Sequence, residues 1–315
     1  MILRHFAWGL PRALLLWAGA DRARNTAGSP YEKHVLGIWL MSEREIQQAA
    51  TQYRETYDTA LSELLSRVWG GNLHLGLFED PAESLLTAQM RAKHHMARAA
   101  NLQTGQEVIE AACGVGSTAR YLASNYGVTV RATNIAETQL AEARELTREA
   151  NLSHLVDFRF ADYHALPFPD SSCDVWWCQE ALLYSVDKRR VLKEAIRVVR
   201  PSGRLIMSDL LLSDSVTGVE RDIFTSTLKA PNMWSLRRWD DLIGNLPLKI
   251  LERRDWSTHT VLTFQKVLEN LEQVREEFVG RVGAEIVKGT FDRLSIQHEA
   301  AKAGKLGWCF YALLR

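Results

Sequence analysis

Residues 106–116 constrain the fold of this chain more than any other stretch, because their sequence is Gln-Glu-Val-Ile-Glu-Ala-Ala-Cys-Gly-Val-Gly. An apolar pair leads into Glu110, a loop of small residues ends in Gly114 and Gly116, and a helical pattern begins at Ser117. This order predicts a strand, a tight glycine turn and a helix start. In such a turn the backbone can approach a ligand closely, and free N–H groups at the helix start can bind it. The carboxylate of Glu110, near the end of the strand, can accept hydrogen bonds from a ribose hydroxyl or an ammonium group.

Apolar strands and helices alternate along the rest of the central segment. Predicted strands cover residues 107–111, 128–132, 155–160, 173–178 and 204–209, and predicted helices cover residues 117–125, 137–150 and 188–199. Such alternation predicts an α/β fold with a parallel sheet and helices on both faces. Ligands of these sheets bind at the carboxyl ends of the strands.

The pattern changes after residue 209. Residues 216–245 have a helical pattern, residues 248–256 that of a strand, residues 258–303 that of one or two long helices, and residues 306–314 that of a last strand. We therefore expect a helical substrate cap at 216–305, interrupted by the strand at 248–256. The other expected parts are an N-terminal extension at 1–40, a helical lid at 41–100, a ligand-binding core at 101–215 and the last strand of the core sheet at 306–315. Met41 begins a segment typical of a natural start, so residues 1–40 are expected to be an addition to it.

Charge and cysteine content narrow the classes of function. Lysine plus arginine and aspartate plus glutamate both number 38, and the resulting zero net charge gives no indication of a nucleic-acid or anionic-membrane partner. The four cysteines have neither the spacing of a metal site nor that of a disulfide framework, which favours a reducing cytoplasm and no metal. The first twenty residues resemble a signal peptide, but Pro11 and Arg12 break the apolar run, and no segment is long enough to span a bilayer.

Polar residues follow each of the next predicted strands, and the carboxyl ends of parallel strands share one edge of a sheet. Asn134 follows the second strand, Asp162 the third and Gln179 the fourth. Asn134 can bind ribose hydroxyls or cap the next helix, and Asp162 can accept from an adenine amino group or form a turn. A glycine turn also serves nicotinamide and flavin cofactors, but Ala119 stands where the third glycine of G-x-G-x-x-G would fall.

The 106–116 segment resembles the first motif of class I S-adenosylmethionine (SAM) methyltransferases. From about Gln47 to its end, the chain most resembles the glycine, sarcosine and dimethylglycine N-methyltransferase group, near the quinone and sterol C-methyltransferases. The motifs that carry this resemblance are Trp69-Gly70-Gly71-Asn72-Leu73-His74-Leu75-Gly76, Trp177-Cys178-Gln179-Glu180-Ala181-Leu182 and Gly307-Trp308. The resemblance implies a Rossmann-like, mostly parallel seven-stranded sheet, SAM as cofactor, S-adenosylhomocysteine as product and a small-molecule acceptor. The residues expected to contact the cofactor are Tyr57, Glu110, Ala112, Gly114, Gly116, Asn134, Ile135, Gln139, Asp162, Tyr163 and Gln179.

Three positions depart from that group. Ala112 replaces the first glycine of the cofactor loop, which we expect to be tolerated if its φ is negative. Asp209-Leu210-Leu211-Leu212 stands where the group has Asp-Pro-Met-Gln, and Tyr184 stands where it often has histidine. These changes predict a more apolar acceptor pocket.

Methyl transfer from SAM needs a positioned, desolvated acceptor more than it needs protein-borne chemistry. His74 or Glu180 can take a proton from an amine acceptor, and Tyr184 can fix the acceptor or the sulfonium. Expected pocket walls are Trp69, Trp177 and Trp234, whose aromatic faces suit cations. Trp176 and Trp177 are adjacent in a strand and face opposite sides, so at most one lines the site.

Other chemistries stay open at this point. Aromatic walls also stabilise the carbocation formed when an alkene is methylated, and Arg91, Lys93, Arg237 and Arg238 would then be candidates to bind the diphosphate of a prenyl acceptor, with Mg²⁺. O-methylation is possible as well. A SAM-binding protein without catalysis is the third hypothesis. The resemblance slightly favours N-methylation.

Overall fold

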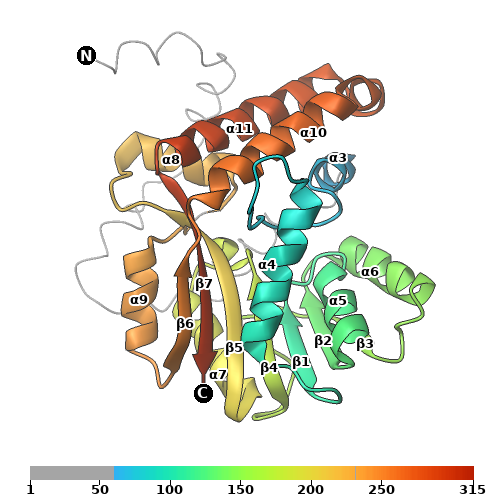
Figure 1. Ribbon diagram of the computed structural model, residues 1–315, viewed down its shortest axis with the longest axis vertical. Helices are drawn as coiled ribbons and strands as arrows, with labels where there is room; N and C mark the ends of the chain where they lie inside the picture. Colours follow the sequence, from blue (N-terminus) through green and yellow to red (C-terminus); the bar gives the residue numbers. More distant parts are fainter. Residues whose placement is uncertain (1–59, 231) are drawn as a thin grey trace, which may run out of the picture. The chain divides into compact units, whose positions relative to one another are not determined.

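The computed structural model describes residues 60–230 and 232–315, and it is an α/β fold built on one seven-stranded sheet (Figure 1). The strands are β1 (Glu107–Ala111), β2 (Thr129–Asn134), β3 (Val156–Phe160), β4 (Cys173–Gln179), β5 (Val199–Leu212), β6 (Lys249–Asp255) and β7 (Leu306–Leu314). The helices are α3 (Ala60–Val68), α4 (Leu85–Ala100), α5 (Ser117–Tyr126), α6 (Glu137–Glu149), α7 (Lys188–Val198), α8 (Gly218–Thr227), α9 (Leu236–Gly244), α10 (His259–Val282) and α11 (Ala284–Lys302), with a 3₁₀ turn at Leu182–Tyr184.

The strand order is β3-β2-β1-β4-β5-β7-β6. The pairs β1–β2, β1–β4, β2–β3 and β4–β5 are parallel, whereas β7 runs antiparallel to both β5 and β6. The predicted Rossmann-like fold with a mostly parallel sheet is therefore confirmed. The order reverses at β1 and β4, and in open α/β sheets ligands bind beside that switch point.

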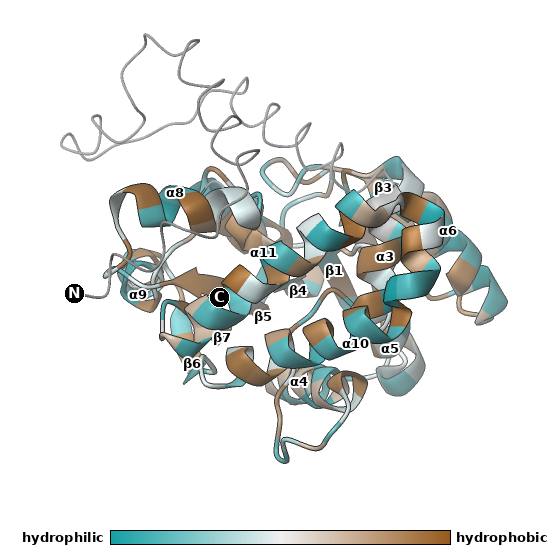
Figure 2. Ribbon diagram, turned by 90° about the horizontal axis from the view of Figure 1, so that it is seen from above, coloured by the Kyte–Doolittle hydropathy of each residue, from teal (hydrophilic) through white to brown (hydrophobic). Residues whose placement is uncertain are grey.

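The central strands β1, β4, β5 and β7 are buried on both faces, which explains their mostly apolar sequences, whereas the edge strands β3 and β6 are largely exposed and polar. Val108, Trp177 and Phe310 belong to the core under α4, α5 and α6, while Trp176 and Tyr311 belong to the opposite core under α7 and α9. The helices are correspondingly amphipathic, and Figure 2 shows hydrophobic and hydrophilic residues mixed along α4, α10 and α11. No helix in the described part of the chain is long and apolar enough to cross a membrane.

Of the helices after β5, α8, α10 and α11 lie at the carboxyl ends of the parallel strands, whereas α9 packs on a face of the sheet. Figure 1 shows α10 and α11 above that edge, antiparallel to each other, before the chain returns through β7. The predicted helical stretch 216–245 is two helices, α8 and α9, because Pro231 disfavours a continuous helix there.

The predicted turn at residues 200–203 is a large bulge within β5. Cys173 pairs with Val199 and Val175 pairs with Arg204, so residues 200–203 stand opposite a single residue of β4. Ser202 takes a left-handed φ of 66° there. β5 therefore begins at Val199 rather than at the predicted residue 204, because it pairs with β4 both before and after the bulge.

Candidate functional site

The loop between β1 and α5 has the backbone that a glycine turn requires. The φ angle is 54° at Gly114 and 74° at Gly116, which is the N-cap of α5. A Cβ at Gly116 would lie 2.6 Å from the Phe158 ring, so glycine is needed for close packing. A Cβ at Gly114 would meet no atom within 4 Å. The loop backbone at Gly114 is thus open to a ligand.

Ala112 does not meet the condition under which alanine fits this turn without strain. Its φ is 59°, not negative, so an L-residue occupies the left-handed region in which the related group has glycine. Such a conformation costs a non-glycine residue about 1–2 kcal/mol. The loop therefore keeps the conformation that glycine would favour, with local backbone strain.

Two buried polar groups at the ends of β1 and β4 have atoms without hydrogen-bond partners among the described residues. They are Oε2 of Glu110 and Nε2 of Gln179, and these side chains are 3% and 4% exposed. Burial raises the pKa of Glu110 to about 8, against the opposing charge of Lys93. An unpartnered acceptor and an unpartnered donor on neighbouring strands suit the ammonium and carboxylate of the amino-acid part of SAM. The residues present therefore fit this cofactor.

Asn134 is the last residue of β2 and is tied to its neighbours. Its Nδ2 donates to Gln139 Oε1 at 2.8 Å and to the Gly114 carbonyl at 3.4 Å, and its Oδ1 accepts from the Ile135 N–H at 2.8 Å. These bonds join the ends of β1 and β2. Contacts of Asn134, Ile135 and Gln139 with the cofactor remain predictions.

Asp162 follows β3 and is held by His164. Its Oδ1 accepts the His164 backbone N–H at 2.8 Å and lies 2.6 Å from His164 Nδ1, while Nε2 of that ring lies 2.9 Å from Ser185 Oγ. Burial, the largest single influence, raises the pKa of Asp162, but the bonds and charge of His164 together outweigh it and leave that pKa below its usual value. The neighbouring Tyr163 hydroxyl donates to the Ala181 carbonyl at 3.4 Å. The adenine contact predicted for Asp162 is untested.

Glu180, directly after β4, is the centre of a hydrogen-bonded cluster. Its Oε2 lies 2.7 Å from His74 Nδ1, and its Oε1 accepts from Trp308 Nε1 at 2.9 Å and from the Ser208 hydroxyl. The Glu180 and His74 side chains are 6% and 18% exposed. Glu180 also has a left-handed φ of 45°. The fold therefore brings His74 and Glu180, 106 residues apart, into direct contact.

Two buried residues of α4 hold the loop that carries His74. Gln89 Nε2 lies 3.1, 2.9 and 2.8 Å from the carbonyls of Trp69, Asn72 and His74. Lys93 Nζ donates to Asn72 Oδ1 at 3.3 Å and to Ser117 Oγ at 3.1 Å, and burial lowers the pKa of Lys93 to about 8. Sequence reasoning did not assign these roles, although polar residues four apart on the apolar face of a helix indicate a buried polar network.

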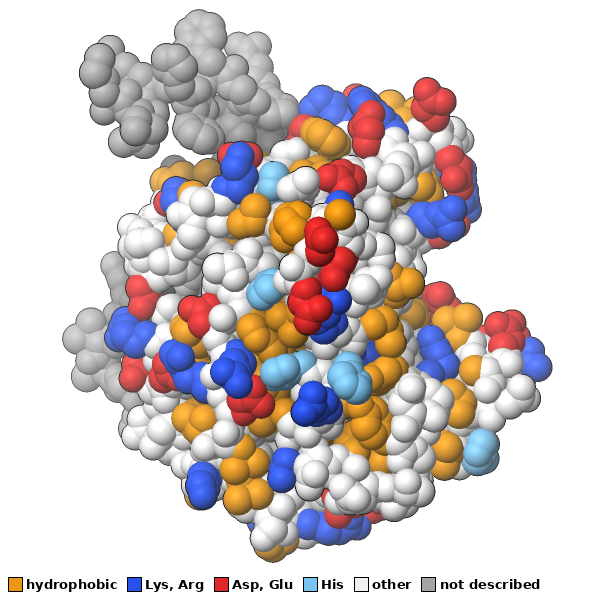
Figure 3. All heavy atoms as spheres, in the orientation of Figure 1, with side chains coloured by type: hydrophobic (Ala, Val, Ile, Leu, Met, Phe, Trp, Pro, Cys, Tyr) orange, Lys and Arg blue, Asp and Glu red, His pale blue; other side chains and the backbone are white. Residues whose placement is uncertain are grey.

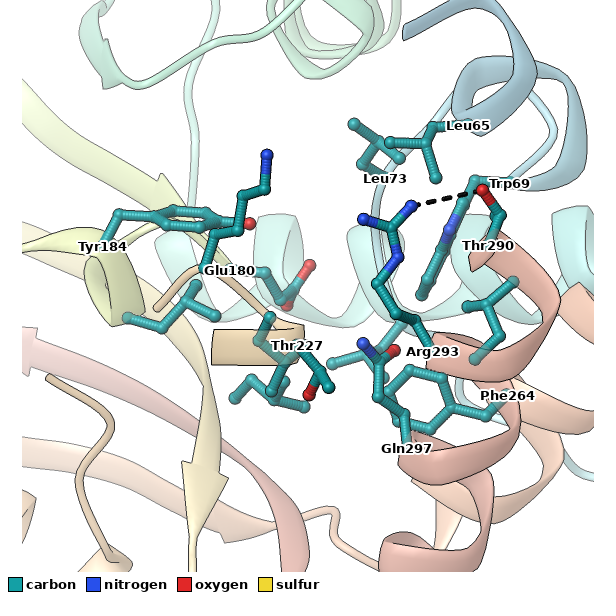
Figure 4. Close-up of a pocket in the computed structure, with 16 residues that line it drawn as sticks. Leu65, Trp69, Leu73, Glu180, Tyr184, Thr227, Phe264, Thr290, Arg293 and Gln297 are labelled. Carbon is teal, nitrogen blue, oxygen red and sulfur yellow. Dashed lines mark hydrogen bonds between the residues drawn. The ribbon is translucent and has the colours of Figure 1, made fainter. Parts of the chain in front are cut away.

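A cavity of about 140 Å³ lies between the ends of β4 and β5 and the helices α3, α10 and α11 (Figure 4). Its walls are mostly apolar. The lining residues are Leu65, Trp69, Leu73, Leu75, Glu180, Leu183, Tyr184, Leu210, Thr227, Leu228, Lys229, Phe264, Thr290, Arg293, Leu294 and Gln297.

Three predicted site residues, Trp69, Glu180 and Tyr184, line this cavity. Trp177 does not line it, since this side chain is fully buried in the core of the sheet. Trp234 does not line it either: its Nε1 donates to Asn232 Oδ1 at 2.8 Å and its ring packs against Trp239. Tyr57 lies outside the described residues.

The turn that carries Tyr184 is fixed by a buried lysine and aspartate. Lys188 Nζ donates to the carbonyls of Leu182 at 2.6 Å, Ser185 at 3.2 Å and Asn232 at 2.7 Å. Asp209 Oδ1 accepts the Leu183 N–H at 2.9 Å, and burial raises the pKa of Asp209. Asp209 thus supports the turn, and the next residue, Leu210, faces the cavity.

Comparisons with known proteins agree with this geometry. Residues 109–207 match the methyltransferase domain family model. The chain is 32% identical over 242 residues to the glycine/sarcosine/dimethylglycine N-methyltransferase of Actinopolyspora halophila, covering 76% of this chain but only 43% of that protein. It is also 32% identical to the 27-O-demethylrifamycin SV methyltransferase of Amycolatopsis mediterranei (strain S699), covering 76% of this chain and 90% of the relative.

A solved structure from Galdieria sulphuraria, described as a sarcosine dimethylglycine methyltransferase candidate, superposes with a TM-score of 0.74. It is 26% identical, and the match covers 80% of this chain and 97% of that one. The strand order, the glycine turn after β1 and these similarities show that the chain belongs to the class I SAM-dependent methyltransferases.

Proposed function

We propose that this enzyme methylates the nitrogen of a small amine bound in the cavity beside Glu180. The observation that carries the proposal is the Glu180 cluster: a carboxylate on the cavity wall, oriented by Trp308 and Ser208 and backed by His74. SAM, when bound, supplies a methyl group already activated on a sulfonium. The protein then has to position the acceptor nitrogen and remove its proton.

The cluster can do both. A carboxylate oxygen accepts from an amine N–H and so aligns the nitrogen lone pair. Because a carboxylate accepts hydrogen bonds, His74 donates from Nδ1 to Glu180 Oε2, and the carboxylate on the cavity wall is the group placed to take the departing proton. The apolar walls exclude water from the reacting groups, which strengthens these interactions.

The cations considered for a prenyl diphosphate are engaged elsewhere. Arg91 is paired with Glu83 at 2.6 Å, Arg237 bonds Asp214 at 3.0 Å, and Arg238 lies over the Trp234 ring. Neither these three nor the buried Lys93 lines the cavity. These four cations are therefore not placed to bind a prenyl diphosphate in this cavity, and the preference for an amine over a carbon acceptor rests on the Glu180 cluster. The intact Glu180–His74 pair argues against a binding protein without catalysis.

Net charge is zero, and on the face shown in Figure 3 acidic and basic side chains are interspersed, which favours a small-molecule acceptor.

We place the reaction in the cytoplasm, where SAM is available. We further assign residues 41–100 to a lid and residues 216–305 to a substrate cap. Leu65 and Trp69 in the first, and Phe264 and Arg293 in the second, support this division because they wall the cavity.

Replacing Glu180 tests the proposal. Glu180→Gln keeps the shape of the side chain but removes its charge, and we expect kcat to fall by about 10²- to 10⁴-fold while the Kd for SAM changes little. The matched control is Glu276→Gln, which makes the same change at an exposed carboxylate on α10. Turnover is measured as the rate at which S-adenosylhomocysteine forms when a pool of small amines is supplied as acceptors. Full activity of Glu180→Gln would remove the carboxylate from the mechanism.

A further inference from the structure

One helix presents a polar stripe to an otherwise apolar cavity. Thr290, Arg293 and Gln297 follow one another at helical spacing on α11, and all three line the cavity. Thr290 is 1% and Gln297 is 6% exposed. Polar side chains buried against an apolar space are unusual unless they bind something.

Arg293 is the charged member of this stripe. Its guanidinium donates to Thr290 Oγ1 at 3.2 Å, and no carboxylate within residues 60–230 and 232–315 lies within 4.0 Å of it. Burial lowers the pKa of Arg293, because a half-buried guanidinium has lost part of its hydration. A cation held in this way is stabilised by an anion that enters the cavity.

The cavity has an acid on the facing wall. Figure 4 shows Glu180 and Tyr184 on one side and Arg293 on the other, with Leu65, Leu73 and Phe264 among the side chains around the space. Lys229 also lines the cavity and adds a second positive charge to its wall. The arrangement is complementary to a molecule with a nitrogen at one end, an anion at the other and an apolar body between them.

We infer that Arg293 binds a carboxylate of the acceptor, and that the acceptor is an amine with an apolar body and a carboxylate group. This inference rests on the proposed N-methylation for the position of the nitrogen, but the anion site stands on Arg293 itself. A planar guanidinium matches a carboxylate through two parallel N–H···O bonds. The mostly apolar lining suits the apolar body of such a molecule.

Binding of a matched pair of probes tests the anion site without turnover. The full chain, loaded with S-adenosylhomocysteine, is titrated calorimetrically with 4-methylpentanoate and with 4-methylpentanamide, which share the apolar body and differ in charge. We expect the acid to bind about 10-fold or more tightly than the amide. Arg293→Met should weaken acid binding by about 10- to 100-fold and leave amide binding unchanged, and Arg293→Lys should recover part of the loss.

The matched control is Arg275→Met, an exposed arginine on α10 paired with Glu272, which should leave both probes unchanged. Equal binding of acid and amide by the unmodified protein would overturn the inference. An equal loss of both probes in Arg293→Met would also overturn it, because a packing defect would produce that result.

Turnover separates this inference from the proposed function. 6-Aminohexanoate, 6-aminohexanamide and hexylamine, in which an apolar chain separates the amine from the other end, are offered with SAM. Methylation of all three at the same kcat/KM would refute the carboxylate site and leave amine methylation standing. No methylation of any amine, together with selective binding of 4-methylpentanoate through Arg293, would refute the proposed reaction and retain the anion site.

Discussion

Replacing Ala112 with glycine should not destabilise the protein, although glycine usually does. Ala112 has φ of 59°, a conformation that costs an L-residue about 1–2 kcal/mol and costs glycine almost nothing. Two effects of the substitution oppose this gain. The greater chain entropy of glycine in the unfolded state lowers the free energy of unfolding by about 0.5–1 kcal/mol, and the loss of a half-buried methyl group lowers it by about 0.4 kcal/mol. The net effect on the free energy of unfolding is a gain of about 0.5 kcal/mol, or no change.

The control is the same substitution where φ is helical. Ala141 is exposed on α6, and Ala141→Gly should lower the free energy of unfolding by about 1 kcal/mol. Urea titrations of the parent and both variants, with their midpoints and slopes, give the comparison. We expect a gap of about 1–1.5 kcal/mol between the two variants. Equal destabilisation by both substitutions would refute the left-handed assignment at Ala112.

Three further predictions concern the cofactor site and the loop of His74. Burial raises the pKa of Glu110 to about 8, so this carboxyl is mostly protonated at pH 7 before SAM binds, and the ammonium of SAM favours its ionised form. SAM binding at pH 7 should therefore release a proton from Glu110, and Glu110→Gln should lose this release. Calorimetry in buffers of different ionisation enthalpy measures the proton release. Asp162→Ala should weaken SAM binding by about 10-fold or more in a titration, and unchanged affinity would count against the adenine contact. Gln89→Leu, which removes the donor to three loop carbonyls, should lower kcat through the position of His74 while the Kd for SAM stays within about 2-fold, and an unaltered kcat would show that the loop holds its shape without Gln89.

The centre of the sheet was predictable because strands such as β1 and β4 are buried on both faces and appear as short apolar runs between turns and amphipathic helices. β1 agrees residue by residue with its predicted range, and the other parallel strands before the bulge differ by one or two residues at their ends. The bulge in β5 was missed because Pro201 and Gly203 indicate a turn, and local sequence does not show that pairing continues on both sides of it.

The site was predictable where a local motif carries it. His74 lies in the Trp-Gly-Gly loop and Glu180 directly follows β4, so both could be selected, but their 2.7 Å contact depends on packing between distant segments. Arg293 was missed because a lone arginine in a long polar helix is usually solvated, and only the tertiary fold shows that it faces a cavity. The left-handed φ of Ala112 could not be read from the sequence, because residue type does not fix φ where the surrounding turn imposes it.

The most direct test of the central claim is mass spectrometry of the products that the purified chain forms from SAM carrying a deuterated methyl group. One acceptor pool contains small amines and amino acids, and the other contains prenyl diphosphates and related alkenes, with and without Mg²⁺. We predict a labelled methyl group on the nitrogen of a member of the amine pool, without any need for Mg²⁺. A labelled methyl group on carbon in the second pool alone, or SAM bound without product in either pool, would contradict the assignment of Glu180 and its cavity to amine methylation.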